Sequence, residues 1–366
     1  MKYKVTLFLQ SAGKGGAERF MIGLANELSA NGHEVSLVVT KNNGEYEDEL
    51  RASVEYFNLD TSKMIFALPK LISYIKHYKP DYLISSVYNA NMVAATSGLF
   101  FKNTKVIVRE SSMHIDMKNQ LGGGFIYKII VSLMKYLYKK SYCVVTLTND
   151  MFKEMNELLP ASKNKIKLIN NFIDIEQIQH LSGEKLSHPW IKEGEKIPII
   201  LGIGRLVHQK NWRLLLDAFA RLSEGKECRL VILGEGIERN DLEIYANKLG
   251  ISKKLYMPGF ISNPFPWLKF AKLFVLTSNW EGFPNVLAQA LSVGCNIIST
   301  RCGSGPSEIL EDGKWGRLIE KGNLIQLVDA LEEALGETNH LDGRSRAKKF
   351  SKTSIVKKYE NLFING

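Results

Sequence analysis

The segment Trp280-Glu281-Gly282-Phe283-Pro284-Asn285-Val286-Leu287-Ala288-Gln289-Ala290-Leu291 follows a short apolar run, Leu273–Leu276. The run is typical of a buried strand, the glycine and proline predict a tight turn, and the residues from Val286 onward have helical spacing. The first N–H groups of a helix lack intrahelical partners and lie at the positive end of its dipole, so this arrangement predicts an anion site. The acid Glu281 directly before such a helix indicates either a ligand contact or a carboxylate that caps an ordinary turn.

The same alternation of apolar runs and helical patterns extends over both halves of the chain, which predicts an α/β protein with two doubly wound parallel sheets. A polar stretch with several glycines and charges interrupts the pattern and is interpreted as a linker. The expected organisation is a first Rossmann-like domain at 1–178, a linker at 179–196, a second Rossmann-like domain at 197–348 and a terminal helix at 349–366 that packs back on the first domain. We expect strands at 5–9, 34–40, 54–57, 82–85, 106–108, 142–147, 166–169, 197–203, 229–233, 255–260, 273–277 and 296–300.

The composition limits the class of protein. With 366 residues and 45% hydrophobic residues, the chain is long enough for two well-packed domains, and extensive disorder is not expected. No apolar run reaches the roughly 18 residues that a membrane span requires. The basic and then apolar start, Met1–Leu9, runs into a glycine turn and is interpreted as a first strand rather than a signal peptide. The four cysteines have no metal-ligand spacing, which is typical of reduced cytosolic thiols.

Positive charge is concentrated in one part of the chain. Of the net charge of +10, +9 lies between Ser62 and Tyr142, because this segment contains 12 Lys or Arg residues and only 3 Asp or Glu residues. Such a block indicates a polyanionic partner: nucleic acid, anionic lipid or a phosphorylated acceptor.

Within this block, residues 125–140 form an amphipathic pattern in which Lys128, Lys135 and Lys139 share one helical stripe, and residues 69–79 have a similar character. Basic helices with Tyr and Phe suit an anionic membrane surface. The alternative is that both helices pack on the first sheet and their lysines are a solvated face. Because the aromatic residues have helical spacing and no nucleic-acid recognition motif is present, we expect no nucleic-acid partner.

Two further loops have the residues of a phosphate site. Gly204–Asn211 leaves a strand and enters a helix with Arg205 and Lys210 five residues apart, which suits a diphosphate; a solvated loop is the alternative. Gly13, Gly15 and Gly16 follow the first strand, but their spacing does not match the full dinucleotide-binding pattern. This loop is therefore interpreted as a close approach of backbone to a ligand, or as a tight turn without one.

The order and spacing of these segments resemble the retaining glycosyltransferases of family 4, which have the GT-B fold of two Rossmann-like domains facing across a cleft. The resemblance extends nearly from end to end and is to bacterial surface-glycan and O-antigen-type sugar transferases. It is carried by Gly15–Arg19, Asn171–Asp174, Gly204-Arg205 with Lys210, Gly234–Gly236 and Glu281–Phe283.

The resemblance implies a role for each segment. Arg205 and Lys210 would bind the donor diphosphate and neutralise the leaving group, and Glu281 would hold donor-sugar hydroxyls and stabilise an oxocarbenium-like transition state. The implied donor-binding residues are Gly16, Phe260, Ile261, Phe283, Asn285, Val286, Leu287 and Gln289. Because fixed cations can assist phosphate departure, we expect neither a metal nor another cofactor.

The chain departs from the family pattern at two places. The family usually has a second Glu where this chain has Gln289, whose amide can still bond a ribose diol. Many members also have a His near the reacting sugar; Arg109 and Glu110 occupy that place here, and His114 follows a few residues later. Glu110 is a catalytic candidate, and Arg109 and His114 are acceptor-side candidates. An ion pair of Glu110 with Arg109 or a lysine is the alternative.

These observations predict a retaining, metal-independent hexosyltransferase that uses a nucleotide-diphosphate sugar, with UDP as the expected nucleotide and a hexose or N-acetylhexosamine as the sugar. The expected acceptor is a polyprenyl-diphosphate-linked sugar or another glycan in polysaccharide biosynthesis. The expected location is the cytoplasmic face of the membrane, as a peripheral protein. The alternatives are a nucleotide-sugar epimerase on the same fold, or a basic nucleic-acid- or lipid-binding protein without catalysis.

Overall fold

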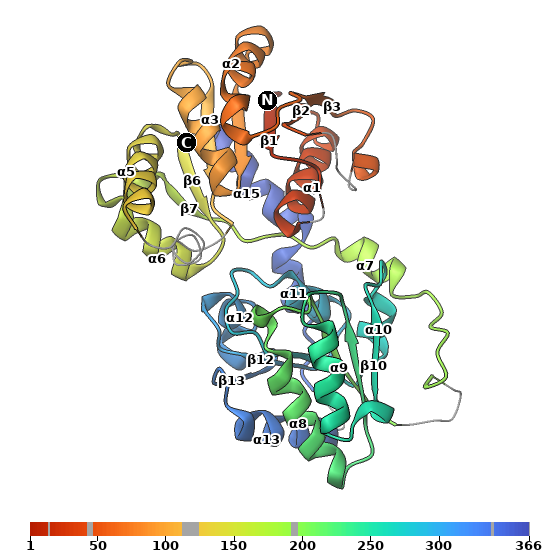
Figure 1. Ribbon diagram of the computed structural model, residues 1–366. Coiled ribbons are helices and arrows are strands. Elements are labelled where there is room, and N and C mark those ends of the chain that lie inside the picture. The colour runs from red at the N-terminus through yellow and green to blue at the C-terminus, as the bar shows by residue number, and fades with distance from the viewer. Residues whose placement is uncertain (14, 42–46, 112–123, 192–196, 338–339, 366) are drawn as a thin grey trace. The chain divides into compact units, whose positions relative to one another are not determined.

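The computed structural model describes residues 1–13, 15–41, 47–111, 124–191, 197–337 and 340–365. The chain divides into two compact units (Figure 1). The first consists of Met1–Asn171 with Thr353–Gly366, and the second of Phe172–Lys352. Each unit contains one parallel sheet, as the sequence predicts.

The first unit has seven parallel strands among its described residues, in the order β3-β2-β1-β4-β5-β6-β7. The strand order reverses between β1 and β4, which makes the sheet doubly wound. Its strands are β1 Lys4–Leu9, β2 Glu34–Val39, β3 Glu55–Asn58, β4 Tyr82–Ser86, β5 Lys105–Arg109, β6 Cys143–Thr146 and β7 Ile166–Leu168. Its longer helices are α1 Gly16–Ala30, α2 Ala67–Tyr78, α3 Tyr88–Gly98, α5 Phe125–Lys140, α6 Asn149–Leu158 and α15 Lys352–Asn365.

The strands of this sheet are apolar because helices cover both of its faces. In β1, five of the six residues are buried, and β4 is buried throughout. Parallel strands that are buried on both faces are continuous apolar runs rather than alternating patterns. For this reason the positions of these strands can be predicted from the sequence.

The C-terminal helix α15 belongs to the first unit. The Tyr82 hydroxyl donates to the Phe363 carbonyl at 2.8 Å, and the Tyr142 hydroxyl donates to the Leu362 carbonyl at 2.9 Å. The Phe363 ring also packs on the Tyr82 ring, with the centroids 4.3 Å apart. The last turn of α15 is therefore fixed by Tyr82 of β4 and by Tyr142, which directly precedes β6.

The second unit has six parallel strands among its described residues, in the order β10-β9-β8-β11-β12-β13. The order reverses between β8 and β11. The strands are β8 Ile199–Ile203, β9 Arg229–Leu233, β10 Leu255–Gly259, β11 Leu273–Leu276, β12 Ile297–Thr300 and β13 Arg317–Ile319. The helices are α7 Ile175–Leu181, α8 Trp212–Gly225, α9 Arg239–Lys248, α10 Phe265–Phe270, α11 Asn285–Ser292, α12 Ser304–Ile309, α13 Leu324–Gly336 and α14 Arg344–Ala347.

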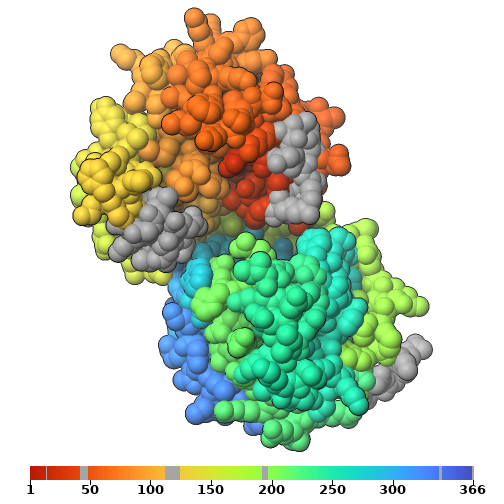
Figure 2. Space-filling model, viewed as in Figure 1, coloured from red at the N-terminus to blue at the C-terminus, as the bar shows by residue number. Residues whose placement is uncertain are grey.

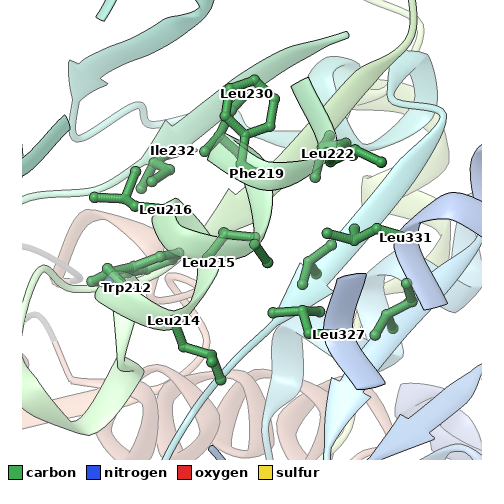
Figure 3. Close-up of a cluster of buried hydrophobic side chains, with 14 of the residues drawn as sticks. Trp212, Leu214, Leu215, Leu216, Phe219, Leu222, Leu230, Ile232, Leu327 and Leu331 are labelled. Atoms are coloured by element: carbon green, nitrogen blue, oxygen red, sulfur yellow. The ribbon is translucent and has the colours of Figure 1, made fainter. Parts of the chain in front are cut away.

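Helix α8 anchors one core of the second unit (Figure 3). Leu215 and Phe219 of α8 pack among residues of β9 and α13, including Leu230 and Leu331, and all four side chains are fully buried. Trp212 begins the helix and is 1% exposed, and its indole N–H donates to the Arg205 carbonyl at 2.9 Å. The core therefore fixes the backbone of the loop that carries Arg205.

The expected strand list lacked β13. This strand has only three residues and lies at the edge of the second sheet, so it gives a weak apolar signal. In the part of the chain that the structure describes, no helix is both long and apolar enough to cross a membrane.

Candidate active site

The loops that leave β8, β9 and β10 pack backbone against backbone in the second unit. Gly204 N–H donates to the Leu233 carbonyl at 2.9 Å, and Gly234 N–H donates to the Gly259 carbonyl at 2.8 Å. Gly234 has φ +148°, and a Cβ there would lie 1.9 Å from the Gly204 carbonyl oxygen. Glycine is required because only a residue without a side chain permits this contact. These contacts place the Arg205 loop at the carboxyl edge of the sheet.

Glu281 lies in the loop between β11 and α11, where two side chains hold its carboxylate. Lys210 Nζ donates to Glu281 Oε1 at 2.5 Å, and Ser278 Oγ donates to the same oxygen at 2.7 Å. The Lys210 and Glu281 side chains are 13% and 9% exposed. An ion pair this well shielded from water is held more firmly than a surface pair. The structure thus joins two of the predicted site residues directly.

The backbone around this pair is also fixed. Thr277 Oγ1 donates to the Lys210 carbonyl at 2.9 Å, and Glu281 N–H donates to the Cys302 carbonyl at 3.1 Å. Asn279 N–H donates to the Gln209 carbonyl at 2.7 Å. The two loops are therefore bonded to each other at several points, which limits the movement of both charged groups.

Arg205 has a different environment. Its side chain is exposed, and within the described residues it has no ion pair and no side-chain hydrogen bond. Lys210 Nζ has three N–H donors and, in the same part of the chain, a single acceptor, Glu281. The site therefore has a complete guanidinium and two ammonium donors available for an anion.

No side chain caps the N-terminus of α11 among the described residues. The residue before the helix, Pro284, offers no capping oxygen, and Leu287 N–H donates to the Pro284 carbonyl at 3.0 Å. The N–H of Val286 has no backbone acceptor within the described residues. Of the predicted backbone donors, Leu287 is thus already bonded, and Val286 is better placed to receive an anion.

The remaining donor-side residues of the second unit divide into buried and exposed. Phe283 is buried, and its ring packs on Phe350 with the centroids 5.3 Å apart, so its side chain belongs to the core. Phe260 follows β10 and is 77% exposed. Ile261 and Gln289 are half-buried, and the Gln289 amide has no hydrogen-bond partner among the described residues.

Gly16 of the first unit begins α1, with Gly15 as the residue before the helix. A Cβ at Gly16 would meet nothing within 4 Å, whereas a Cβ at Gly15 would lie 1.9 Å from a Glu18 carboxylate oxygen. Packing within the chain therefore does not require glycine at position 16.

Arg109 and Glu110 lie in the interior of the first unit, at the end of β5. The Arg109 guanidinium donates to Ser86 Oγ at 2.8 Å and to Asn171, and it lies over the Phe20 ring at 4.1 Å from the centroid. Burial lowers the pKa of Arg109, and Tyr359 and Glu110 oppose that effect.

The Glu110 carboxylate accepts hydrogen bonds from the Tyr138 hydroxyl and from Asn91 Nδ2, the latter at 3.2 Å. Burial raises the pKa of Glu110, whereas these two hydrogen bonds lower it. The alternative, an ion pair with Arg109 or a lysine, is not found among the described residues, where the carboxylate is bonded to neutral groups. His114, the other candidate of this region, lies outside the described residues.

Ser278 was absent from the residues that the sequence indicated for the site. The signal that could have found it is its position: it is the second polar residue after the apolar strand and lies three residues before Glu281. The partners of Glu110 gave no such signal, since Asn91 and Tyr138 are 19 and 28 residues away in the sequence.

Solved structures with the same arrangement of elements identify the fold. HepE of Anabaena in complex with UDP matches with a TM-score of 0.82 and 17% identity, over 99% of this chain and 100% of that one. The lipopolysaccharide outer core galactosyltransferase WaaB matches with a TM-score of 0.73 and 19% identity, over 98% of both chains. The fold is therefore GT-B, the two-sheet architecture of one large class of glycosyltransferases.

Sequence comparisons give the family. The model "Glycosyltransferase Family 4" matches residues 14–177, and "Glycosyl transferases group 1" matches residues 185–353. An uncharacterised glycosyltransferase of Methanocaldococcus jannaschii is 30% identical over 337 residues, with 81% of this chain and 82% of that protein covered. The chain therefore belongs to the glycosyltransferase family that these two models and this relative represent.

A second relative has a more specific name. It is the N-acetylgalactosamine-N,N'-diacetylbacillosaminyl-diphospho-undecaprenol 4-alpha-N-acetylgalactosaminyltransferase of Campylobacter jejuni, 27% identical over 97% of both chains. With lipopolysaccharide core glycosyltransferases of Rhizobium meliloti also among the relatives, the protein is a glycosyltransferase of glycan assembly.

Proposed function

We propose that the protein transfers a sugar with retention of configuration from a UDP-linked donor to a lipid-linked glycan, in the assembly of a surface polysaccharide. One observation carries the proposal: Lys210 and Ser278 hold the Glu281 carboxylate four residues before the start of α11, and the loop of Lys210 also carries Arg205, whose side chain is exposed and has no ion pair among the described residues. This combines fixed positive groups with one oriented acid, which suits a sugar diphosphate.

The positive groups are proposed to stabilise the diphosphate leaving group. When the glycosidic bond to the diphosphate breaks, negative charge develops on the phosphate oxygens. Arg205 offers planar paired donors, Lys210 offers two further N–H groups, and the α11 N-terminus adds its dipole. Because Lys210 is held by Glu281 and the dipole of α11 is fixed by the helix, these two groups need little reorganisation as the bond breaks. They support a reaction without a metal, which is part of the proposal.

Glu281 is proposed to bind the donor sugar. Lys210 and Ser278 both bond Oε1, so Oε2 remains to accept hydrogen bonds from donor-sugar hydroxyls. Its negative charge also favours the positive charge that develops on the sugar ring in the transition state. Gln289, one turn into α11, is proposed to bond the ribose diol through its amide.

The donor and acceptor classes are proposed from the relatives. HepE is solved with UDP, and the Campylobacter relative is named for the transfer of N-acetylgalactosamine to a diphospho-undecaprenol-linked sugar. We therefore propose a UDP-linked N-acetylhexosamine or hexose as donor and a polyprenyl-diphosphate-linked glycan as acceptor. Epimerisation is less well supported because it needs an acid–base group, and the candidate Glu110 is buried and bonded to Tyr138 and Asn91.

Donor binding is tested first by screening nucleotide sugars for thermal stabilisation and then by calorimetry on Arg205→Ala. Loss of one charge-assisted phosphate contact is worth about 1.5–3 kcal/mol, so we expect UDP-sugar affinity to fall about 10- to 100-fold. Arg221→Ala is the matched control, since Arg221 is an exposed arginine of the same unit on α8. Equal donor affinity in the two variants would remove Arg205 from the site.

We also propose that α5 places the protein on an anionic membrane surface, at the cytoplasmic face. Phe125 and Ile126 are 76% and 68% exposed, and Ile129 and Tyr136 are more than half exposed. The buried residues of α5 all lie in its second half, so the apolar side chains Phe125, Ile126 and Ile129 of its first half remain exposed. Figure 2 shows the yellow segment that contains α5 at the surface of the first unit. Lys128 and Lys139 are exposed beside these residues, and Lys135 is half-buried.

Helix α2, the other basic amphipathic segment, is packed more conventionally. Its apolar residues Leu71 and Ile75 are fully buried, and Lys70 Nζ donates to the Leu59 carbonyl at 2.6 Å and the Asp60 carbonyl at 2.9 Å. The interpretation as a helix packed on the sheet with a solvated basic face therefore fits α2, whereas the exposed apolar residues of α5 favour the membrane.

Replacing Lys128, Lys135 and Lys139 by Glu is expected to weaken sedimentation with anionic vesicles about 100-fold or more, since each basic residue near such a surface contributes about 1 kcal/mol. The control carries the same charge change at Lys248, Lys253 and Lys321, which are exposed on the second unit. If both triple variants sediment like the unchanged protein, α5 does not bind the membrane through its charge.

A further inference from the structure

A second basic surface, besides that of α5, lies at the amino-terminal ends of β5, β6 and β7. This is the end of the first sheet opposite to the carboxyl ends of its strands. The surface there contains a hollow of about 940 Å³ that is lined by Lys102, Lys105, Lys140, Lys165 and Lys167, together with aromatic and small residues. No Asp or Glu lines it. We call these five residues and the hollow between them the lysine pocket.

The lysine pocket is distinct from the donor site. Its residues belong to the first unit, whereas Glu281, Arg205 and Lys210 belong to the second. It also lies at the amino ends of the strands, while ligands of doubly wound sheets bind at the carboxyl ends. The positive charge of this pocket is therefore not needed for the donor diphosphate.

Of the five lysines, Lys165 has a structural role at the end of a helix. Lys165 Nζ donates to the Lys139 carbonyl at 2.9 Å and the Ser141 carbonyl at 3.1 Å, which satisfies the C-terminus of α5. In the described residues, the side chains of Lys102, Lys140 and Lys167 are exposed and have no ion pair or hydrogen bond. Three lysines without a partner among the described residues thus line one hollow that no carboxylate lines, so no lining acid offsets their repulsion.

Lys105 is a fourth cation of the pocket, and two tyrosines orient it. Its Nζ lies 3.3 Å from the Tyr82 hydroxyl and 3.5 Å from the Tyr142 hydroxyl, and 4.6 Å from the centroid of the Tyr142 ring. Burial lowers the pKa of Lys105, but the two tyrosines more than offset this effect and raise it above its ordinary value. The tyrosines therefore hold the ammonium in place and keep it charged.

We propose that the lysine pocket binds a phosphate-bearing ligand. Ammonium groups bind phosphate as point charges, and several of them around one hollow match a group with two or more anionic oxygens. The rim supports the same ligand class: Leu99 and Tyr136 line the hollow and are exposed, as suits a phosphate attached to an apolar body. The phosphate can come from an anionic lipid headgroup or from a soluble phosphate compound.

The test uses inorganic diphosphate as the probe, with calorimetry on the full chain. Lys102→Glu with Lys167→Glu is expected to lower diphosphate affinity at the lysine pocket about tenfold or more, because two charge-assisted contacts are lost. Lys248→Glu with Lys253→Glu gives the same change of charge on the second unit and is expected to have no effect. Both replaced lysines of the pocket are exposed, so the variant is expected to keep its melting temperature.

Arg205→Ala separates this site from the donor site. If the diphosphate titration shows two binding events, one lost in each variant, both sites are supported. If Arg205→Ala removes all binding and the lysine variant removes none, the lysine pocket is overturned and the donor site stands. If only the lysine variant removes binding, the pocket stands and the donor site fails.

Vesicle flotation identifies the source of the phosphate. Reduced binding of the Lys102/Lys167 variant to phosphatidylglycerol vesicles, with no binding of either protein to phosphatidylcholine vesicles, supports a lipid headgroup. Unchanged flotation together with lost diphosphate binding supports a soluble phosphate ligand. Unchanged flotation together with unchanged diphosphate binding overturns the proposal.

Discussion

Replacing Glu281 by Gln is expected to reduce sugar transfer by a factor of about 100 to 1,000, the usual effect of removing one oriented group that stabilises transition-state charge. Gln has nearly the same shape and can still accept hydrogen bonds from Lys210 Nζ and Ser278 Oγ, which now lie 2.5 and 2.7 Å from Glu281 Oε1. The variant therefore removes the negative charge while it keeps the geometry. We expect the loss to appear in kcat rather than in donor affinity.

The measurement is UDP release from the donor identified in the screen, with the acceptor present, together with thermal unfolding. Lys210 loses its charged partner, so we expect a stability loss of about 1–2 kcal/mol and a folded protein at the assay temperature. Glu332→Gln removes an exposed carboxylate of α13 in the same unit and is expected to leave transfer unchanged. Near-normal turnover of Glu281→Gln would reject this residue as the sugar's partner.

Gly305→Ala is expected to damage the same site without touching a charged group. A Cβ at Gly305 would lie 1.8 Å from the Gly282 carbonyl oxygen and 3.1 Å from Pro284 Cδ. Because no backbone atom can approach so closely, the start of α12 and the Glu281 loop must move apart. Overpacking of this kind costs about 1–3 kcal/mol, and a shift of about 1 Å in a positioned group can cost on the order of 100-fold in rate.

This prediction is checked by measuring the rate of transfer and the free energy of unfolding in the same preparation. The matched control is Gly336→Ala at the end of α13, where an added Cβ would meet nothing within 4 Å. We expect the control to be as active as the unchanged protein and slightly more stable, since Ala is the better helix former. A Gly305→Ala variant with unchanged rate would show that the loop tolerates displacement.

The strands of both sheets were predictable because parallel strands buried on two faces are nearly continuous apolar runs, as in Val5–Leu9 and Leu273–Leu276. The ends of these runs also located the loops that carry Arg205, Lys210 and Glu281. The three-residue strand β13 was not predictable, because a short edge strand buries too little to leave a pattern.

The surroundings of Glu110 could not be read from the sequence. An acid at the end of a predicted strand is a reasonable catalytic candidate, yet Asn91 and Tyr138 bond its carboxylate inside the first unit. Burial depends on what α3 and α5 place over the strand, and that cannot be read from the neighbouring residues. The lysine pocket was missed for the same reason, since its lysines come from segments between Lys102 and Lys167.

The two parallel-sheet units, the glycosyltransferase family and the loops where charged residues follow strands were all predictable from the sequence. These properties are local, because strand burial, turn chemistry and the spacing of motifs depend on neighbouring residues. Which charges meet depends on the tertiary structure. Lys210 pairs with Glu281 across 71 residues, Arg205 has no ion pair among the described residues, Glu110 is buried, and five lysines line one hollow at the amino ends of β5, β6 and β7. The reason is physical: the effect of a charge depends on its neighbours in space and on its exposure to water, and folding sets both.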